Sequence, residues 1–184
     1  MSGIDFILVR HGRQTAGFGH DADPGLDHTG HAQAEDLAAR LTPGEAARLV
    51  ASPLRRARET AAAVERRHAV TARVEPAIAE VPTPGLGLAE RGAWLPGFLH
   101  GLWSEQPAHL RDWRHSIGAF FAGVEAPAVF ISHFVVINAL IGLATDDDRV
   151  SPTMPDHCSI NRFRASGGRI HLVAAGAQRE TIIG

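Results

Sequence analysis

The stretch FILVRHG, residues 6–12, decides the fold of this chain. Its four apolar residues in a row are typical of a strand that is buried on both faces, as in a parallel sheet. The run ends abruptly on Arg10, His11 and Gly12. Because ligands of open α/β sheets bind at the carboxyl ends of the strands, a cation, an imidazole and a permissive backbone here suit an anionic substrate and a nucleophile. These three residues alone are equally compatible with the solvated end of a strand.

The composition predicts one globular domain over residues 1–184. The chain is 45% hydrophobic and 21% charged, with a formal net charge of −2, so it has the balance of an ordinary soluble protein and no basic surface for nucleic acid. No uninterrupted apolar run is long enough to cross a bilayer, and no membrane partner is expected. Only five residues precede the first predicted strand, which leaves no room for a signal peptide, so a cytoplasmic location is expected.

Two features of the composition exclude whole classes of chemistry. The chain has no lysine, since all 18 basic residues are arginine, and this excludes Schiff-base chemistry and a P-loop lysine. The single Cys158 excludes an intramolecular disulfide framework and any multi-cysteine metal site. Two acidic stretches resemble metal ligands, residues 20–23 and 146–148, but solvated loops are the better interpretation of both. No metal and no cofactor are predicted.

Strands and helices are expected to alternate along the chain. A first helix capped by Thr29 ends at Thr42-Pro43-Gly44, and a second is capped by Ser52 with Pro53 as its first residue. Glycines between residues 83 and 108 favour loops. The other predicted elements are strands at 48–51, 70–74 and 128–132, helices at 109–124 and 135–144, and a hairpin at 159–174. This order predicts a three-layer α/β/α sandwich with a mostly parallel central sheet.

Cationic and imidazole side chains follow three of these strands. His11 and Arg10 end the first strand, His133 ends the strand at 128–132, and Arg56 lies in the first turn of the helix after the strand at 48–51. Because such ends gather at one edge of a parallel sheet, we expect these side chains to converge. Two arginines, two imidazoles and a helix N-terminus suit a phosphate dianion.

On these residues the chain resembles the histidine phosphatase superfamily, the phosphoglycerate-mutase-like branch 1. The matching blocks occur in the family's order along most of the chain. They are Arg10-His11-Gly12, residues 26–41 with Gly30, Gln33 and Ala34, residues 52–57 with Thr60-Ala61, Ile78-Ala79-Glu80, and Ile131-Ser132-His133. The resemblance implies a phosphoglycerate-mutase-like fold and a small phosphorylated substrate.

The resemblance also implies a reaction, the hydrolysis of a phosphomonoester through a phosphohistidine. His11 would attack phosphorus, while Arg10, Arg56 and His133 hold the non-bridging oxygens. Glu80 would protonate the leaving oxygen and then activate water. The reaction needs neither metal nor cofactor. Substrate contacts are expected from Gly12, Gln14, Thr15 and Phe134.

Three departures from the family pattern leave alternatives open. Arg13 intervenes between Gly12 and Gln14, residues 81–84 read Val-Pro-Thr-Pro after Glu80, and Phe134-Val135 replace two glycines. The apolar pair narrows the pocket or favours an apolar substrate, and Trp94 and Trp103 are further candidates for specificity. The alternative functions are a mutase-type phosphotransferase, an inactive module that binds phosphorylated ligands and, more remotely, a metal-dependent phosphoesterase.

Overall fold

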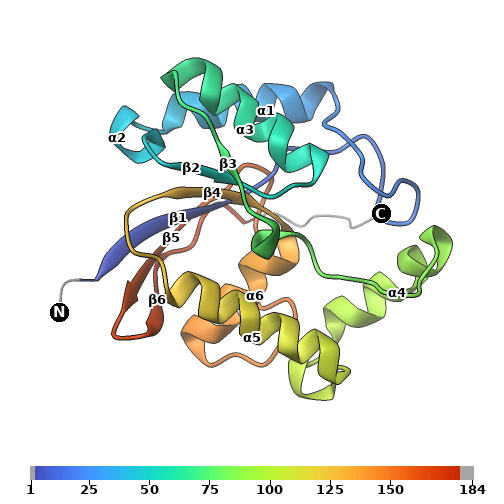
Figure 1. The fold of residues 1–184 in the computed structure, drawn as a ribbon. Helices are drawn as coiled ribbons and strands as arrows, with labels where there is room; N and C mark the ends of the chain where they lie inside the picture. The colour runs from blue at the N-terminus through green and yellow to red at the C-terminus, as the bar shows by residue number, and fades with distance from the viewer. Residues whose placement is uncertain (1–2, 179–184) are drawn as a thin grey trace.

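The stretch that opens the chain forms an inner strand of a six-stranded sheet (Figure 1). The computed structural model describes residues 3–178, so the ends of the predicted domain, 1–2 and 179–184, lie outside it. The strand order is β3-β2-β4-β1-β5-β6. The strands are β1 Ile4–Arg10, β2 Leu49–Ala51, β3 Arg73–Val74, β4 Val129–Ser132, β5 Ile160–Ser166 and β6 Arg169–Ala174.

The sheet is parallel on one side of β1 and antiparallel on the other. β1 pairs in parallel with β4, β4 with β2, and β2 with β3. β5 pairs antiparallel with β1 and with β6. Strands β5 and β6 form the predicted C-terminal hairpin. Its turn is made by Gly167 and Gly168, whose φ angles of 59° and 74° favour glycine. The predicted mostly parallel sheet is therefore confirmed.

Helices cover both faces of the sheet, as Figure 1 shows. Ile7 and Val9 of β1 pack with α1 and α3 on one face, while Phe6 and Leu8 pack with α5 and α6 on the other. This alternation confirms the predicted three layers, with both faces of β1 buried. The helices are α1 His28–Arg40, α2 Pro43–Ala46, α3 Arg55–His68, α4 Leu88–His100, α5 Ala108–Ala122 and α6 Phe134–Thr145, with 3₁₀ turns η1 Pro76–Ile78 and η2 Trp103–Glu105.

The predicted helix caps are wrong in both helices of the first face. Helix α1 is capped by Asp27, whose Oδ1 accepts the Gly30 N–H at 2.7 Å, and not by Thr29. Helix α3 begins at Arg55 without a side-chain cap from its N-cap residue. Its first N–H is accepted instead by Asp23 of a distant loop, at 2.8 Å. Ser52, the predicted cap, is therefore left for another partner.

Two further boundaries differ from the predictions. The strand expected at 70–74 is reduced to Arg73–Val74, an exposed pair at the edge of the sheet. Thr42-Pro43-Gly44 follows the end of α1 as predicted, but Thr42 also starts α2 by forming a capping box with Glu45. Neither difference changes the order of the inner strands.

Helix α4 is missing from the predictions, because Gly85, Gly87 and Gly92 favoured loops. Its first turn is stabilised by Glu90, whose carboxylate accepts the Gly87 N–H at 2.7 Å. Its apolar residues Leu95, Phe98 and Leu99 pack in a cluster that includes Trp103 and Leu110. Burial of this face stabilises the helix against the propensity of its glycines. Among residues 3–178, no helix is both long and apolar enough to cross a membrane.

Candidate functional site

Three strand ends meet at one edge of the sheet. In the parallel register Arg10 of β1 lies opposite Ser132 of β4, and Ala51 of β2 lies opposite Ile131. The next residues continue this alignment: the His11 N–H donates to the Ser132 carbonyl and the Ser52 N–H to the Ile131 carbonyl, both at 3.0 Å. The predicted convergence is therefore realised by the register of the sheet. We call Arg10, His11, Arg56 and His133 the His–Arg cluster.

His11 is 3% exposed and is held between two partners. Its Nδ1 lies 2.7 Å from the Gly12 carbonyl oxygen, and its Nε2 lies 3.1 Å from Nε of Arg56. Since a carbonyl only accepts and a guanidinium only donates, Nδ1 carries the proton and Nε2 carries the lone pair. Burial, followed by the charges of Arg56 and Arg10, lowers the pKa of His11 well below its usual value. The ring is therefore neutral, with its nucleophilic nitrogen beside a guanidinium.

The two arginines of the cluster are buried and remain charged. Arg10 donates to the Pro155 carbonyl at 2.9 Å, and its guanidinium lies 5.2 Å from the centre of the Phe134 ring. Burial lowers the pKa of Arg10 to about 10 and also lowers the pKa of Arg56. At neutral pH Arg10 therefore keeps its proton. Taking two cations out of water is costly, so this arrangement is suited to an anion that neutralises them.

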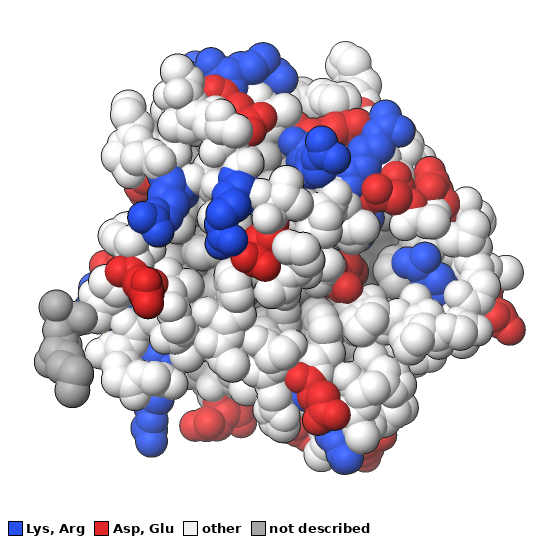
Figure 2. Space-filling view, in the orientation of Figure 1, with Lys and Arg blue, Asp and Glu red and all other residues white. Residues whose placement is uncertain are grey.

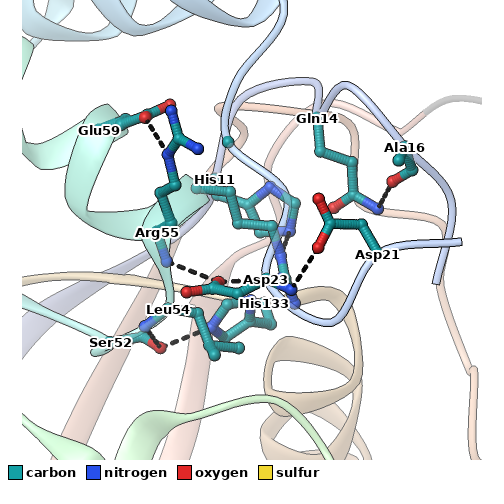
Figure 3. A network of polar contacts seen from close by, with 12 residues as sticks. His11, Gln14, Ala16, Asp21, Asp23, Ser52, Leu54, Arg55, Glu59 and His133 are labelled. Atoms are coloured by element: carbon teal, nitrogen blue, oxygen red, sulfur yellow. Dashed lines mark hydrogen bonds and ion pairs between the residues drawn. The ribbon is translucent and has the colours of Figure 1, made fainter. Parts of the chain in front are cut away.

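His133 is fully buried beside His11, with the two ring centres 5.2 Å apart. Its Nε2 lies 2.6 Å from the Ser52 hydroxyl, a contact that Figure 3 shows next to His11. The Ser52 oxygen also accepts the Leu54 N–H at 3.3 Å, so its own proton is free to be donated to Nε2. This contact is compatible with a His133 proton on Nδ1, an atom with no hydrogen-bond partner among the described residues. His133 does not itself line the cavity described below.

Glu80 follows η1 and lies in the cavity wall with both arginines of the cluster. Burial raises the pKa of its carboxyl group, although the Arg56 charge opposes the shift. One carboxylate oxygen accepts the Val81 N–H at 3.0 Å, which fixes its orientation. The predicted acid is therefore brought to the cluster, despite the Val-Pro-Thr-Pro sequence that follows it. Its environment favours the protonated form more than water does.

The predicted substrate contacts divide into two groups. Gln14, Thr15 and Phe134 line the cavity. Gly12 does not: a Cβ on it would lie 2.6 Å from the Gly30 carbonyl, and its N–H donates to Thr60 at 3.0 Å. Glycine is required here by the close approach of α1, and the predicted contact of Gly12 with substrate stays a prediction.

Arg10, His11 and Arg56 of the His–Arg cluster line a cavity of about 320 Å³. Figure 2 shows this face of the molecule, hollowed between charged side chains and a largely uncharged surface. Several lining residues were absent from the predicted site: His157, Arg13, Phe18, Leu95 and Leu99. His157 lies 6.1 Å from His11 between ring centres, and burial lowers its pKa to about 4. The antiparallel pairing of β5 with β1 brings it there, which no local pattern predicts.

The aromatic residues proposed to set specificity lie elsewhere. Trp103 is buried in the core cluster, and Trp94 stacks on Phe98 with ring centres 4.4 Å apart. Neither lines the cavity. The spacing of Leu95 and Leu99 along an amphipathic helix is the signal that could have identified the actual wall.

The acidic stretches are bound within the protein. Asp23 accepts from Arg55 and lies 4.0 Å from Arg56, while Asp147 and Asp148 pair with Arg149, Arg114 and Ser104. In the described part of the chain no group of three or more His, Cys, Asp or Glu residues is arranged to hold a metal ion. The hydrogen bonds and ion pairs of these acidic residues therefore stabilise the local structure of their loops.

The comparisons agree with the resemblance read from the sequence. Residues 6–86 match the sequence model of the histidine phosphatase superfamily (branch 1), which confirms that resemblance for the segment containing His11, Arg56 and Glu80. His133 lies beyond the matched residues. No curated protein matches the chain significantly in sequence.

Solved structures match the fold over almost the whole chain. A mycobacterial glucosyl-3-phosphoglycerate phosphatase is 20% identical, with a TM-score of 0.72 over 96% of this chain and 100% of its own. A phosphoserine phosphatase from Entamoeba histolytica, in complex with 3-phosphoglyceric acid, is 19% identical, with a TM-score of 0.73 over 96% of this chain and 98% of its own. At this identity the likeness establishes the fold.

Proposed function

We propose that this chain, whose residues 6–86 match the histidine phosphatase superfamily (branch 1), hydrolyses phosphomonoesters through a phosphohistidine on His11. The observation that carries the proposal is the state of the His11 ring. Its Nδ1–H bond to the Gly12 carbonyl leaves Nε2 unprotonated, and this nitrogen lies 3.1 Å from the Arg56 guanidinium. A neutral imidazole aimed at a site that attracts phosphate is the nucleophile such a reaction requires.

The first step transfers the phosphoryl group to the enzyme. Substrate phosphate displaces the Arg56 contact of Nε2, so that Arg56 and Arg10 bind the non-bridging oxygens and the Nδ1–H of His133 donates to a third. The bond between Nε2 and phosphorus forms as the ester P–O bond breaks, and Glu80 gives its proton to the departing oxygen. The cluster stabilises the charge that spreads over the equatorial oxygens.

The second step returns the enzyme to its starting state. The Glu80 carboxylate takes a proton from water, whose oxygen attacks phosphorus while the N–P bond breaks. Inorganic phosphate leaves, with His11 again neutral and Glu80 again protonated. Burial of Glu80, which raises its pKa, supports both roles of the carboxyl group.

Phosphate release from p-nitrophenyl phosphate, measured in excess chelator, tests the proposal. Wild type is expected to turn over and to yield an acid-labile phosphoryl adduct that maps to His11. His11→Ala should abolish both signals, and Arg56→Ala should lower kcat/KM by at least about a hundredfold, since hydrogen bonds to charged groups are worth about 1.5–3 kcal/mol each. Binding of phosphate without turnover would instead support the binding module.

The mutase alternative differs in the fate of the phosphorylated enzyme. Wild type labelled on His11 is expected to lose the label to water at a rate that 3-phosphoglycerate does not change. Transfer of the label to added phosphoglycerate, with slow loss to water, would contradict the proposed hydrolase and support a phosphotransferase.

A further inference from the structure

The cavity above the His–Arg cluster is apolar on the side away from the arginines. Leu95 and Leu99 of α4 face it together with side chains from three other segments of the chain. The apolar wall consists of Phe18, Val81, Leu95, Leu99, Phe134 and Val135. Leu95, Leu99 and Phe134 also belong to a core cluster, so the wall is continuous with the packed interior. A surface of this kind gains free energy when an apolar group displaces its water.

Outside the His–Arg cluster, Arg13 is the one arginine of the described lining, and its charge is already paired. The guanidinium of Arg13 is engaged by Asp27 at 2.6 Å and by Thr29 at 2.9 Å. His157 lies where burial and the Arg10 charge disfavour its protonated form. A substrate with a carboxylate or second phosphate would therefore have to compete with Asp27 for Arg13 or place that charge against the apolar wall, which is costly.

Two further charges lie near the cavity, and they act in opposite directions. The Asp23 carboxylate lies 4.0 Å from Arg56 and therefore repels additional negative charge near that arginine. The Arg91 guanidinium is not part of the cavity lining, but it lies over the Phe18 ring, 4.3 Å from its centre, and its charge helps to lower the pKa of Arg56. The volume of about 320 Å³ is at the small end of ligand sites. The space suits a compact leaving group.

We propose that the preferred substrates are small phosphomonoesters of uncharged, apolar alcohols, alkyl or aryl. This inference rests on the proposed phosphatase function. The phosphate binds the His–Arg cluster, and the alkyl or aryl group packs against the apolar wall. When the P–O bond breaks, Glu80 protonates the leaving oxygen, so the product is a neutral alcohol that the wall also accommodates.

A series of alkyl phosphates with leaving groups of similar basicity tests the inference on the wild-type enzyme. From ethyl to n-butyl phosphate, kcat/KM is expected to rise roughly fourfold per added methylene, from about 0.8 kcal/mol per buried CH₂. n-Pentyl phosphate is expected to be at least about tenfold better than 4-carboxybutyl phosphate, which has the same number of carbon atoms. A flat series, or equal use of the carboxylate-ended compound, would overturn the inference.

Variants assign the preference to the wall. Leu99→Asn and Phe18→Ser should each reduce the ratio of kcat/KM for n-pentyl over 4-carboxybutyl phosphate by about tenfold or more, while inhibition by inorganic phosphate stays unchanged. Phe18 is only half-buried, so its variant tests the inference even if Leu99→Asn fails to fold. Leu88→Asn is the matched control, because Leu88 is 39% exposed on the same helix and does not line the cavity. An unchanged ratio in Phe18→Ser would mean that the wall does not select the leaving group.

The two proposals fail in distinguishable ways. If no phosphate is released from any compound, p-nitrophenyl phosphate included, and no adduct forms on His11, the phosphatase function itself is wrong. If phosphoserine, 3-phosphoglycerate and the alkyl series are all hydrolysed with similar kcat/KM, the phosphatase function stands and the apolar substrate class is wrong.

Discussion

A short polar contact holds each imidazole of the His–Arg cluster. The Gly12 carbonyl fixes the His11 proton on Nδ1, and we propose that the Ser52 hydroxyl donates to Nε2 of His133 and so keeps the proton of that ring on Nδ1. One ring thus presents a lone pair and the other presents a donor. With both pKa values lowered by burial, neither ring needs to change its charge before substrate binds. On the proposed function, the two imidazoles therefore have opposite roles.

Ser52→Ala tests the positioning of His133. Loss of the hydroxyl leaves the buried Nε2 without its donor and frees the ring to change tautomer, so kcat should fall about tenfold to a hundredfold with a much smaller change in KM. The rate of phosphohistidine formation in single turnover is the measurement. Ser159→Ala, which also removes a buried serine hydroxyl, should leave that rate unchanged. An equal loss in both variants would point to a general loss of stability.

The pH dependence should follow Glu80 on the alkaline side. Its pKa is raised, so the acid form needed in the first step persists above the usual range and is lost as pH rises through the folded-state pKa. The lowered pKa of His11 keeps the nucleophile neutral well below about pH 6.5. Glu80→Gln should lower kcat by about 10²–10⁴-fold and remove the alkaline limb. The control variant Glu75→Gln should keep the alkaline limb. If the alkaline limb also survives in Glu80→Gln, it belongs to another group.

Most of the site could be predicted from residues at strand ends, because an apolar run that stops at a polar residue indicates where a strand ends. Arg10, His11 and His133 belong to this group. His157 and Arg13 do not, because His157 reaches the cavity through the pairing of β5 with β1, and Arg13 through the path of a loop. Ser52 was predicted at the correct place with the wrong partner, since a helix cap and a histidine donor use the same hydroxyl.

At the scale of elements, α4 shows how packing overrides local propensity. Two glycines and a proline lie inside it, yet Leu95, Phe98 and Leu99 hold it against the rest of the core. The same helix supplies part of the cavity wall. Helices α1 and α3 show the converse: their apolar spacing made them predictable, whereas their caps depend on loops that local sequence does not place.

A pair of glycine substitutions separates these effects. Gly97→Ala in α4 should stabilise the protein by about 0.5–1 kcal/mol, because no atom lies within 4 Å of the added Cβ and alanine is the better helix former. Gly30→Ala in α1 should destabilise it by about 1–3 kcal/mol, since the added Cβ would overlap the Arg13 carbonyl. Urea unfolding measures both. A loss of stability in Gly97→Ala would contradict the open space beside α4.

At the scale of the whole molecule, buried neutral histidines should make stability depend on pH. His11, His133 and His157 have lowered pKa values, so the unfolded chain binds more protons than the folded one below about pH 6.5, and stability falls as pH falls. The contribution of Glu80 to the pH dependence of stability has the opposite sign, because its raised pKa favours the folded state at lower pH. Because three imidazoles act against one carboxyl group, we expect a net loss of stability as pH falls.

His157→Asn isolates one contribution to this loss. With a folded pKa of about 4, His157 accounts for about 2 kcal/mol of the difference in unfolding free energy between about pH 7 and pH 5. The variant should therefore lose about that much less stability on acidification. His109→Asn, a change at an exposed position of α5, is the control. The same pH dependence in wild type and His157→Asn would show that this ring is not held neutral by the fold.

The register that aligns the three strand ends also has a consequence for biosynthesis. His11 emerges early from the ribosome, but its neighbour His133 follows much later, and Arg10 finds its carbonyl partner in a residue 145 positions further along the chain. Contacts of such separation form late, after the cost of closing long loops. On the proposed function, a nascent or truncated chain thus carries its nucleophile without these partners, and activity requires the chain at least as far as Pro155.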